Sequence, residues 1–311
     1  MEHTSYNIAV LLTCYNRKDK TRKCLEQLFL AQHCFNEKHE QQVYISLFIT
    51  DDKCTDGTFD AVADICKNHE LTIIEGDGNL YWAGGMRTAW AKALLEKDRW
   101  NFYLLLNDDT EVFNNVFDEL LSTHSYSLEK YHKAGIYSGI TCDINDTSHI
   151  TYGGDVFNTK AKGTWHRLEE AEEPRLVDMI NANILLVPDS VVEKIGIFPD
   201  CYVHSCADTD YCMTARRNNI PALVTAKACG ACEDDHLSKE EECLMLMEMS
   251  LNERRKYVNH PTHSDSDYLM CIKRNMRYKY PISWMIRKIR LFFPGLYYKI
   301  SKHRGLYKKT V

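Results

Sequence analysis

The sequence contains no long hydrophobic run. No uninterrupted apolar stretch in its 311 residues approaches the roughly 18 to 20 residues that a membrane-spanning helix needs. The N-terminus also lacks the basic start, apolar stretch and small-residue cleavage site of a secretory signal. We therefore expect a cytoplasmic protein that does not cross a membrane.

The sequence also lacks the regular cysteine spacing of a disulfide-rich protein. The 13 cysteines are odd in number and scattered, so we expect reduced thiols rather than a disulfide framework. One CxxC pair, Cys229 and Cys232, lies close to His236 and is similar to part of a zinc site. No second clean pair accompanies it, so buried thiols are the expected state and a structural zinc ion is the alternative.

Acidic residues are absent from the last part of the chain. From Tyr268 to the end there are 12 Lys and Arg residues and no Asp or Glu, a charge of +12. The first 267 residues carry 26 basic and 44 acidic side chains, a charge of −18. Nucleic-acid binding is disfavoured, because it would place basic residues around the active cleft. An anionic membrane surface suits a basic, aromatic-rich tail better.

The sequence does contain an alternation of apolar runs and helical patterns. Continuous apolar runs are typical of buried parallel strands, and apolar positions at helical spacing are typical of the helices that cover them. We therefore predict a doubly wound, mostly parallel α/β sheet with its ligands at the carboxyl ends of the strands. The predicted strands are 7–14, 43–50, 71–75 and 102–106, and the predicted helices are 18–31, 59–68 and 85–96.

After about residue 135 the pattern changes to shorter strands and turns, which indicates a mixed second half. We assign residues 1–237 to one domain and residues 238–311 to a helical extension. The short strands and turns expected in the second half lie near 152–154, 184–187 and 222–225.

The extension is predicted to begin with one charged helix over 238–258 and a polar linker over 259–267. Further on, a basic helix has an apolar stripe on one side, and Pro294 is expected to end it. Such a helix either packs against the body or lies on a membrane surface. The stripe comprises Ile282, Met285, Ile286, Ile289, Phe292 and Phe293.

The end of the fourth predicted strand places two acids side by side. Asn107, Asp108 and Asp109 follow five apolar residues. Adjacent carboxylates repel unless a cation is near, and their oxygens suit Mg²⁺ or Mn²⁺. A metal site is therefore one interpretation of this motif. A solvated turn or a helix N-cap is the other, since Asn and Asp favour both.

The two preceding connections add polar groups at the same edge of the predicted sheet. Residues 51–58 (DDKCTDGT) form an acidic turn, and residues 79–87 (NLYWAGGMR) follow the third strand. There, Gly84 and Gly85 are predicted to open a helix whose backbone N–H groups approach a phosphate, with Arg87 adding positive charge. Together with the adjacent acids, these segments predict a site with three walls.

Four motifs therefore stand in order along the chain, and in this order they resemble those of family 2 glycosyltransferases of the GT-A fold. The resemblance is greatest to the rhamnosyltransferase-like branch of that family. It covers about residues 7–236, with a looser similarity over 268–280. The motifs are 13–17 (TCYNR), 51–58, 79–87 and 104–112 (LLLNDDTEV).

The resemblance implies a GT-A domain with a nucleotide-binding half, 1–115, and an acceptor half, 116–237. The donor would be a nucleoside-diphosphate sugar. Thr13 and Tyr15 would line its base, and Asp52 would accept a hydrogen bond from the ring N–H. The remaining donor contacts are implied for Arg17, Trp82, Gly85, Arg87 and, near the ribose, Asp108.

The resemblance also implies one divalent cation, Mg²⁺ or Mn²⁺, bound to the diphosphate. Asp109 would bind it, and a cation there neutralises the charge that develops on the departing diphosphate. The first acidic position of the family motif is here Asn107, so we expect one direct carboxylate ligand rather than two. His236 is the second expected metal ligand, with a lone surface histidine as the alternative.

In the second half, residues 203–217 resemble the family's ED-x-D segment, with Ala207 in place of the usual Glu. The resemblance implies that Asp208 is the general base, which takes the proton of the acceptor hydroxyl in an inverting transfer. A helix N-cap is the alternative role for Asp208. Asp210 is expected to cap the helix or to pair with one of the two arginines near its end.

The implied activity is transfer of a sugar from a UDP- or dTDP-sugar to a saccharide or lipid-linked saccharide in surface polysaccharide synthesis. The rhamnosyltransferase-like branch favours dTDP-rhamnose, and residues 268–311 would hold the enzyme on the cytoplasmic face of an anionic membrane. A nucleotidyltransferase is one rival, with the basic residues at 17–20 as its phosphate grip. The other rival is a non-catalytic protein that binds sugar nucleotides or glycans, to which Asn107 and Ala207 point.

Overall fold

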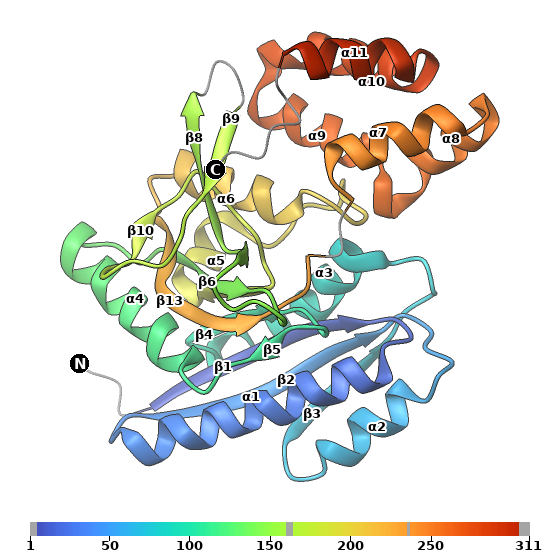
Figure 1. Ribbon diagram of the computed structural model, residues 1–311. Helices are drawn as coiled ribbons and strands as arrows, with labels where there is room; N and C mark the ends of the chain where they lie inside the picture. The colour runs from blue at the N-terminus through green and yellow to red at the C-terminus, as the bar shows by residue number, and fades with distance from the viewer. Residues whose placement is uncertain (1–4, 160–163, 235–236, 305–311) are drawn as a thin grey trace.

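The computed structural model describes residues 5–159, 164–234 and 237–304. Its first half has four parallel strands in the spatial order β3-β2-β1-β4 (Figure 1). Helices connect successive strands, as the sequence predicts. The elements are β1 (Ser5–Cys14), α1 (Lys18–Lys38), β2 (Gln42–Asp51), α2 (Thr58–Ile65), β3 (Glu70–Glu75), α3 (Tyr81–Ala93), the 3₁₀ helix η1 (Leu94–Arg99) and β4 (Phe102–Leu106).

The second half extends the same sheet through one reversed strand. β12 (Ile184–Pro188) runs antiparallel to β4 on one side and to β6 (Ile136–Cys142) on the other. β13 (Ala222–Ala231) then pairs parallel with β6. The central sheet is therefore mostly parallel, as predicted. The remaining elements of this half are β5 (Glu111–Val112), α4 (Val116–Tyr131), β7 (Ile150–Tyr152), β8 (Gly154–Thr159), β9 (Thr164–Arg167), β10 (Arg175–Leu176), β11 (Met179–Ile180), α5 (Asp189–Ile195) and α6 (Ala207–Arg217).

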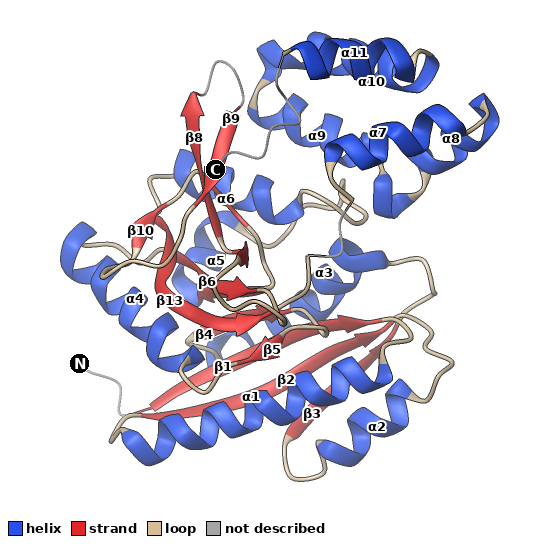
Figure 2. Cartoon of the chain, in the orientation of Figure 1, coloured by secondary structure: helices blue, strands red, loops and turns tan. Residues whose placement is uncertain are grey.

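The sheet is buried on both faces by helices (Figure 2). On β1, Leu11 packs in a cluster with Trp90 of α3 and Tyr211 of α6. Its neighbour Leu12 points to the opposite face and packs in a second cluster with Leu28 of α1. Two-sided burial requires apolar residues at successive positions, which explains the continuous apolar runs. Because the strands are parallel, the polar residues that follow them lie at one edge of the sheet.

The extension forms a group of helices at one end of the molecule (Figure 1). The prediction of a single helix over 238–258 is wrong, because one helix ends at Glu248 and a second begins at Leu251, after Ser250. The Ser250 hydroxyl accepts from the Glu253 N–H at 3.4 Å, and the Ser250 N–H donates to the Glu253 carboxylate at 2.7 Å. The helices are α7 (Lys239–Glu248), α8 (Leu251–Asn259), α9 (Asp265–Asn275), α10 (Tyr280–Phe292) and α11 (Pro294–His303).

The polar linker predicted over 259–267 is also wrong. It contains the 3₁₀ helix η2 (Pro261–His263) and the first turn of α9, which Ser264 caps through a bond from the Ser266 N–H at 3.1 Å. A further 3₁₀ turn, η3 (Arg277–Lys279), joins α9 to α10.

The predicted end of the tail helix is confirmed. α10 stops at Phe292, and Pro294 occupies the first turn of α11, where a missing N–H costs nothing. Within the described residues, no helix combines the length and the apolar character that a membrane span requires.

Candidate functional site

Two adjoining cavities lie where the ends of β1, β2 and β4 meet the first turns of α3 and α6. They have volumes of about 360 and 390 Å³ and share Arg17, Trp82, His204 and Thr262. A larger cavity of about 1170 Å³, lined by Tyr6 and other residues that include none of the motifs, opens at the opposite edge of the sheet. Of the predicted site residues, the first cavity is lined by Thr13, Tyr15, Arg17, Asp52, Trp82 and Asp108, and the second by Arg17, Trp82, Asp109 and Asp208.

The two acids after β4, Asp108 and Asp109, both form ion pairs with the side chain of Arg17. The Arg17 guanidinium lies 3.3 Å from Asp108 Oδ1 and also pairs with the Asp109 carboxylate. Asp108 is buried, and the Thr21 hydroxyl donates to its Oδ2 at 3.2 Å. Burial raises the pKa of Asp108 to about 7, although Arg17 acts in the opposite direction. Asp109 is more exposed and faces the second cavity.

The third member of the motif, Asn107, orients an aromatic wall instead of adding a charge. Its Oδ1 accepts a hydrogen bond from Trp82 Nε1 at 2.7 Å, and its N–H donates to the Asn183 carbonyl at 2.9 Å. Asn107 occupies the position where the family motif has its first acid, and its side-chain oxygen already accepts the Trp82 hydrogen bond. Trp82 lines both cavities as a result of this bond.

Asp52 holds a turn of the main chain. Its Oδ1 accepts the Gly78 N–H at 2.7 Å, and its Oδ2 accepts the N–H groups of Leu80 at 3.0 Å and Tyr81 at 3.2 Å. The carboxylate is buried and lines the first cavity. These three bonds fix the entrance to α3, so Asp52 shapes the cavity wall whether or not it also contacts a ligand.

The glycine pair does not open α3, because the helix begins at Tyr81. The N–H groups of Ala83 and Gly84 donate to the Val203 carbonyl at 3.1 and 3.3 Å, so they are turned to the protein and not to a phosphate. Gly85 instead permits close packing, since a Cβ there would lie 2.0 Å from the Thr13 hydroxyl oxygen. The structure thus gives Gly85 a packing role against Thr13, and its predicted phosphate contact stays a prediction.

Arg87 likewise has another task. Its Nη1 donates to the carbonyls of Pro199 at 3.0 Å and Tyr202 at 3.1 Å. Neither Arg87 nor Gly85 is among the residues that line the two cavities. Arg87 therefore ties α3 to the loop that precedes α6, and a phosphate contact from it would require these two bonds to break.

Asp208 is the second residue of α6 and faces the second cavity. Its Oδ1 accepts the Thr209 N–H at 2.7 Å, and its Oδ2 accepts the Ala182 N–H at 3.2 Å. Burial raises the pKa of Asp208 to about 6, while these amide bonds act to lower it. Cys206 occupies the N-cap position without a side-chain bond, and Asp208 accepts the Thr209 N–H in the first turn, so the same carboxylate supports the start of α6 and lines the cavity.

The expected partners of Asp210 are wrong. Its buried carboxylate accepts bonds from Arg274 Nε at 3.2 Å and Asn275 Nδ2 at 2.5 Å, both from α9. Arg216 pairs with Asp178 instead. α6 is thus held to the extension by an ion pair whose carboxylate is buried.

The extension also forms part of the site, which the sequence did not predict. Asp267 of α9 is buried, and its Oδ2 accepts the N–H groups of Val203, His204 and Ser205 at 3.3, 2.9 and 2.9 Å. His260 and Thr262 line the first cavity. No sequence signal marks these residues, because they lie in a polar stretch that reads as a linker.

The rings around the first cavity pack edge to face. Tyr81 lies 6.3 Å from the ring of His204 and 6.0 Å from that of His260, at interplanar angles of 82° and 89°. Tyr81 also has a positive φ of 52°, as have Asn16 and Cys206 in the neighbouring turns. Positive φ is unfavourable for Tyr and Cys, and such strain gathers at functional loops.

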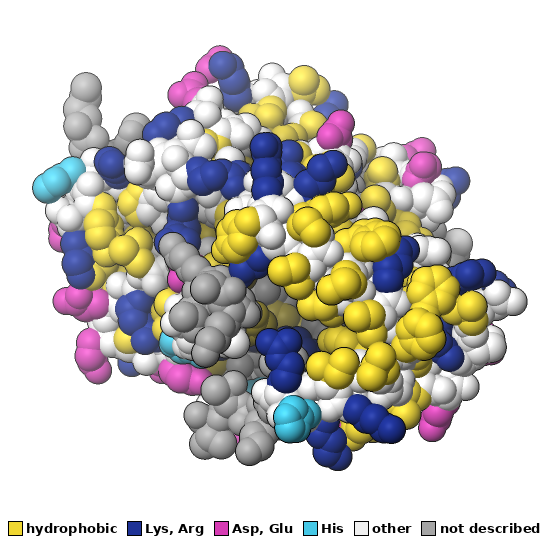
Figure 3. All heavy atoms as spheres, turned by 90° about the horizontal axis from the view of Figure 1, so that it is seen from above, with side chains coloured by type: hydrophobic (Ala, Val, Ile, Leu, Met, Phe, Trp, Pro, Cys, Tyr) yellow, Lys and Arg dark blue, Asp and Glu magenta, His cyan; other side chains and the backbone are white. Residues whose placement is uncertain are grey.

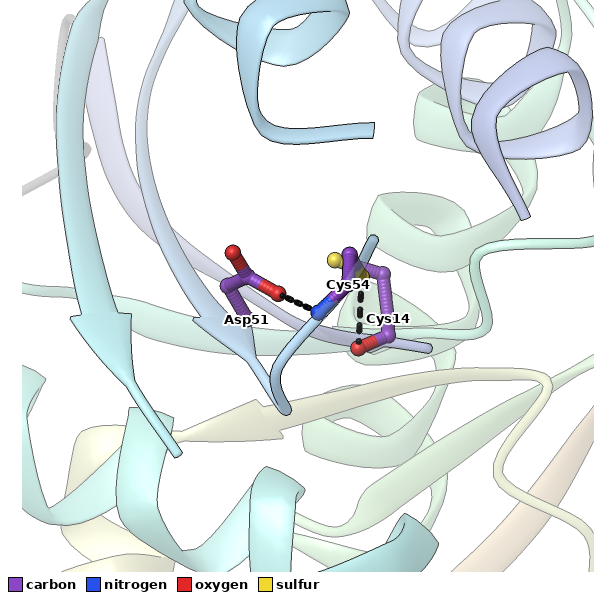
Figure 4. Close-up of side chains that lie close together, drawn as sticks. All are labelled: Cys14, Asp51 and Cys54. Carbon is purple, nitrogen blue, oxygen red and sulfur yellow. Dashed lines mark hydrogen bonds between the residues drawn. The ribbon is translucent and has the colours of Figure 1, made fainter. Parts of the chain in front are cut away.

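A group of possible metal ligands adjoins the first cavity, which Cys14 lines, but it differs from the predicted metal site. Cys14, Asp51 and Cys54 place one ligand atom each within 4.8 Å of the others (Figure 4). The Cys54 N–H donates to Asp51 Oδ1 at 2.8 Å, and the Cys54 thiol donates to the Cys14 carbonyl at 3.5 Å. A hydrogen bond between the thiols raises the pKa of Cys14 and lowers that of Cys54. Thiols do not suit Mg²⁺ or Mn²⁺.

None of the 13 cysteines, all of which lie in the described ranges, forms a disulfide, as expected. Cys229 and Cys232 are buried. His236 lies outside the described residues. Near the predicted position of the metal, Cys232 Sγ lies 4.0 Å from Asp109 Oδ1, and Glu233 lines the second cavity and pairs with Lys20 at 3.2 Å. Glu233 was not predicted.

The comparisons with known proteins agree with this architecture. No family model matches the chain. The hexosyltransferase Agl10 of low-salt glycan biosynthesis from Haloferax volcanii is 24% identical over 160 residues, or 50% of this chain and 49% of its own length. The chain thus spans about half the length of this curated relative.

Solved structures give the class of fold. S. aureus TarS 1-349 in complex with UDP has a TM-score of 0.56 at 13% identity, covering 97% of this chain and 93% of its own. The same protein in complex with UDP-GlcNAc has a TM-score of 0.53 at 13% identity, covering 88% and 72%. The chain has the GT-A glycosyltransferase fold.

Proposed function

We propose that this protein is an inverting glycosyltransferase that transfers a sugar from a nucleoside-diphosphate donor to a saccharide acceptor. One observation carries the proposal. Two cavities adjoin at Arg17 and Trp82; one contains most of the predicted nucleotide-binding residues, all but Gly85 and Arg87, and the other contains Asp208, a carboxylate with a raised pKa. A transferase needs both halves, because donor and acceptor must react within one site.

Several facts support a nucleotide-sugar donor. TarS 1-349 has this fold and was solved with UDP and with UDP-GlcNAc, and Agl10 is a hexosyltransferase. In this chain Thr13 and Tyr15 line the first cavity at the end of β1, and Tyr15 is 57% exposed, which leaves its ring open to a base. We propose a UDP- or dTDP-sugar, with dTDP-rhamnose as the first dTDP-sugar to test.

Asp208 has the properties of a general base. An inverting transfer requires one carboxylate to take the proton from the acceptor hydroxyl as its oxygen attacks the sugar. A pKa of about 6 leaves Asp208 ionised at neutral pH but more basic than an ordinary aspartate. Its two amide bonds hold the carboxylate in place without neutralising it.

The residues present fit one hard divalent cation. We propose that Asp109 holds Mg²⁺ or Mn²⁺, since its carboxylate reaches the second cavity, where Glu233 offers further oxygen atoms. When bound, the cation would supply positive charge for the departing diphosphate. Arg17 already balances Asp108 and Asp109 and lies between the cavities, so its guanidinium can also face a diphosphate.

The two rival functions have less support. A nucleotidyltransferase would use basic residues at 17–20 as a phosphate grip, but of these only Arg17 lines either of the two cavities. Asn107 and Ala207 are the residues that point to a non-catalytic binding protein. Asn107 orients Trp82, Ala207 is fully buried in the core and lines neither cavity, and Asp208 beside it remains on the cavity.

The test measures thermal unfolding and turnover together. UDP, dTDP and their sugars are offered with Mn²⁺, Mg²⁺ or EDTA, because a ligand of the folded state raises the melting temperature. We expect a metal-dependent shift with UDP or dTDP that Asp109→Asn loses. Asp208→Asn should keep the shift and lose turnover. Asp60→Asn, an exposed acid of α2, is the control.

No shift with any nucleotide would contradict the donor site. A shift that survives in Asp109→Asn would contradict the metal ligand. If Asp208→Asn kept both the shift and the turnover, Asp208 would not be the base. A wild-type protein that binds nucleotide sugars but never turns over with any saccharide acceptor would be the non-catalytic rival.

A further inference from the structure

Helix α10 is amphipathic but faces the opposite way from a helix that packs on a core. Its apolar stripe points to solvent: Ile282, Met285 and Ile286 are 58%, 52% and 36% exposed. Its arginines point inward, and Arg290 is only 6% exposed. The predicted choice between a packed helix and a surface helix therefore has a mixed answer, because α10 packs through its charged side and leaves its apolar side open.

Ion pairs hold α10 in this orientation. Arg290 bonds to Glu242 of α7 at 2.7 Å and to Asp265 of α9 at 3.2 Å. Arg287 bonds to the same Asp265 carboxylate at 2.7 Å. Turning the helix over would break three charge-assisted bonds, two of them from the buried Arg290 guanidinium, so the outward position of the stripe is a built feature.

The apolar side chains of α10 and α11 gather on one surface, which we call the apolar face. Seen from above, hydrophobic side chains lie together on this side of the molecule, with Lys and Arg among and around them (Figure 3). A contiguous exposed apolar surface usually marks an interaction site. The apolar face comprises Ile282, Trp284, Met285, Ile286, Phe292, Phe293, Leu296 and Ile300, which are 36% to 63% exposed.

The surroundings of the apolar face are basic. No Asp or Glu occurs from Tyr268 to the end of the chain. Exposed basic side chains lie on the same helices and on the turns before them, among them Arg277, Lys288 and Lys299. Lys288 Nζ lies 5.5 Å from the centre of the Trp284 ring, so charge and apolar surface are interleaved. Bulky apolar side chains among cations are typical of helices that lie in an anionic lipid surface.

We propose that the apolar face of α10 and α11 is a membrane-docking surface that lies among the headgroups of anionic lipids. A second copy of the chain fits less well, because a symmetric contact would bring two segments of like charge together. This proposal deepens the proposed function. It rests on that function for one consequence, namely that a lipid-linked saccharide is the acceptor class presented to the site.

The docking surface is joined to the site by one helix. α10 pairs with Asp265 at the start of α9, and two residues further on Asp267 binds the loop at 203–205. That loop leads into α6, which carries Asp208. A membrane bound at α10 and α11 would therefore be connected to the acceptor side of the site by a continuous set of hydrogen bonds.

The test is vesicle co-sedimentation of the full chain. Vesicles of phosphatidylcholine with phosphatidylglycerol are compared with phosphatidylcholine alone. The variant is Ile282→Ser, Met285→Ser and Phe293→Ser together, all at exposed positions. The matched control is Leu30→Ser, Tyr44→Ser and Leu95→Ser, which are equally exposed but lie on α1, β2 and η1.

We expect wild type and control to bind the anionic vesicles and the variant to bind them at least about tenfold more weakly. High salt should weaken wild-type binding as well. Equal binding to neutral vesicles, or full binding by the variant, would overturn the proposal. So would a wild-type dimer in sedimentation velocity that the variant converts to monomer, with no vesicle binding by either.

The melting shift with UDP or dTDP and Mn²⁺ is measured on the same three proteins. It reports on folding and on the donor site without any lipid. Loss of vesicle binding with an intact shift separates docking from the proposed function. Vesicle binding without any nucleotide shift would leave docking supported and the glycosyltransferase proposal contradicted.

Discussion

Asp208 should impose a pH dependence on the rate. Burial raises its pKa to about 6, and a general base must be ionised to accept a proton. Because the protonated form is inactive, we expect kcat/KM to fall as the pH drops through about 6 and to level off above it. Asp208→Asn should lower kcat by about 10²- to 10⁴-fold and remove this acid limb. Steady-state rates between acid and neutral pH check both.

The control for this prediction is Asp155→Asn. The Asp155 charge adds to the raised pKa of Asp208, so its removal should move the acid limb to lower pH without abolishing turnover. An acid limb near the ordinary pKa of a carboxyl group in wild type would contradict the assignment. So would an Asp208→Asn variant with an unchanged profile.

Gly85 and Gly84 make a second test at the level of single residues. A Cβ at Gly85 would lie 2.6 Å from Thr13 Cβ, whereas at Gly84 the nearest atom, Leu80 Cβ, is 3.4 Å away. Gly85→Ala should therefore lower the free energy of unfolding by about 1–3 kcal/mol. Gly84→Ala should be neutral or stabilise the helix by up to about 1 kcal/mol.

Chemical denaturation of the two variants checks this pair. The same experiment distinguishes packing from phosphate binding at Gly85. A phosphate role would weaken nucleotide binding without lowering stability, and that result would contradict the packing role.

At single residues, the sequence could predict which side chains meet but not what each one binds. Thr13, Asp52 and Asp108 come together because parallel strands end at one edge of a sheet. The partners of Arg17, Asp52 and Arg87 were not predictable. Arg87 bonds to carbonyls more than 100 residues away, for example, and no local pattern specifies such a pair.

Among secondary-structure elements, strands were the most predictable. The apolar runs at 7–14 and 102–106 match β1 and β4 closely, since burial on both faces leaves little choice of residue type. Helix boundaries were less predictable. A charged pattern continues across Met249 and Ser250, but the capping box at Ser250 ends one helix and starts another.

Asp267 offers a test of how α9 supports the site. Its buried carboxylate accepts three main-chain N–H groups from the loop that leads into α6. Bonds to a charged acceptor are stronger than neutral ones, so Asp267→Asn should lower the free energy of unfolding by about 2–3 kcal/mol. Because α6 carries Asp208, kcat should fall more than the KM for the donor rises. Denaturation and steady-state kinetics measure both effects.

Asp265→Asn is the matched control for this helix. Asp265 lies in the same first turn of α9 but binds Arg287 and Arg290 rather than the loop. Its replacement should lower stability and leave kcat and KM with a water-soluble acceptor unchanged. Equal kinetic effects of the two variants would show that Asp267 acts only through overall stability.

For the whole molecule, the site is not confined to the residues before the predicted division at residue 237. Residues 238–311 look like an appendage in sequence, with their own charge and helical pattern. In the structure His260 and Thr262 of this segment line the first cavity. The sequence could not show this, because the contacts depend on how the extension folds back over α3 and α6.

The extension should therefore unfold together with the body. Its separate unfolding would leave the buried Asp210 without Arg274 and would expose the amides that Asp267 binds. Losing one partner of a buried ion pair is costly. We expect a single calorimetric transition whose calorimetric and van't Hoff enthalpies agree.

The variant Arg274→Met tests the ion pair itself. It should lower the free energy of unfolding by about 2 kcal/mol, a moderate loss because Arg274 is partly exposed, and the transition should stay single. Lys256→Met, an exposed cation of α8, is the control and should leave the transition unchanged. Two transitions in wild type would contradict the coupling, because the extension would then be a separate folding unit whose contacts with the body are too weak to support the site.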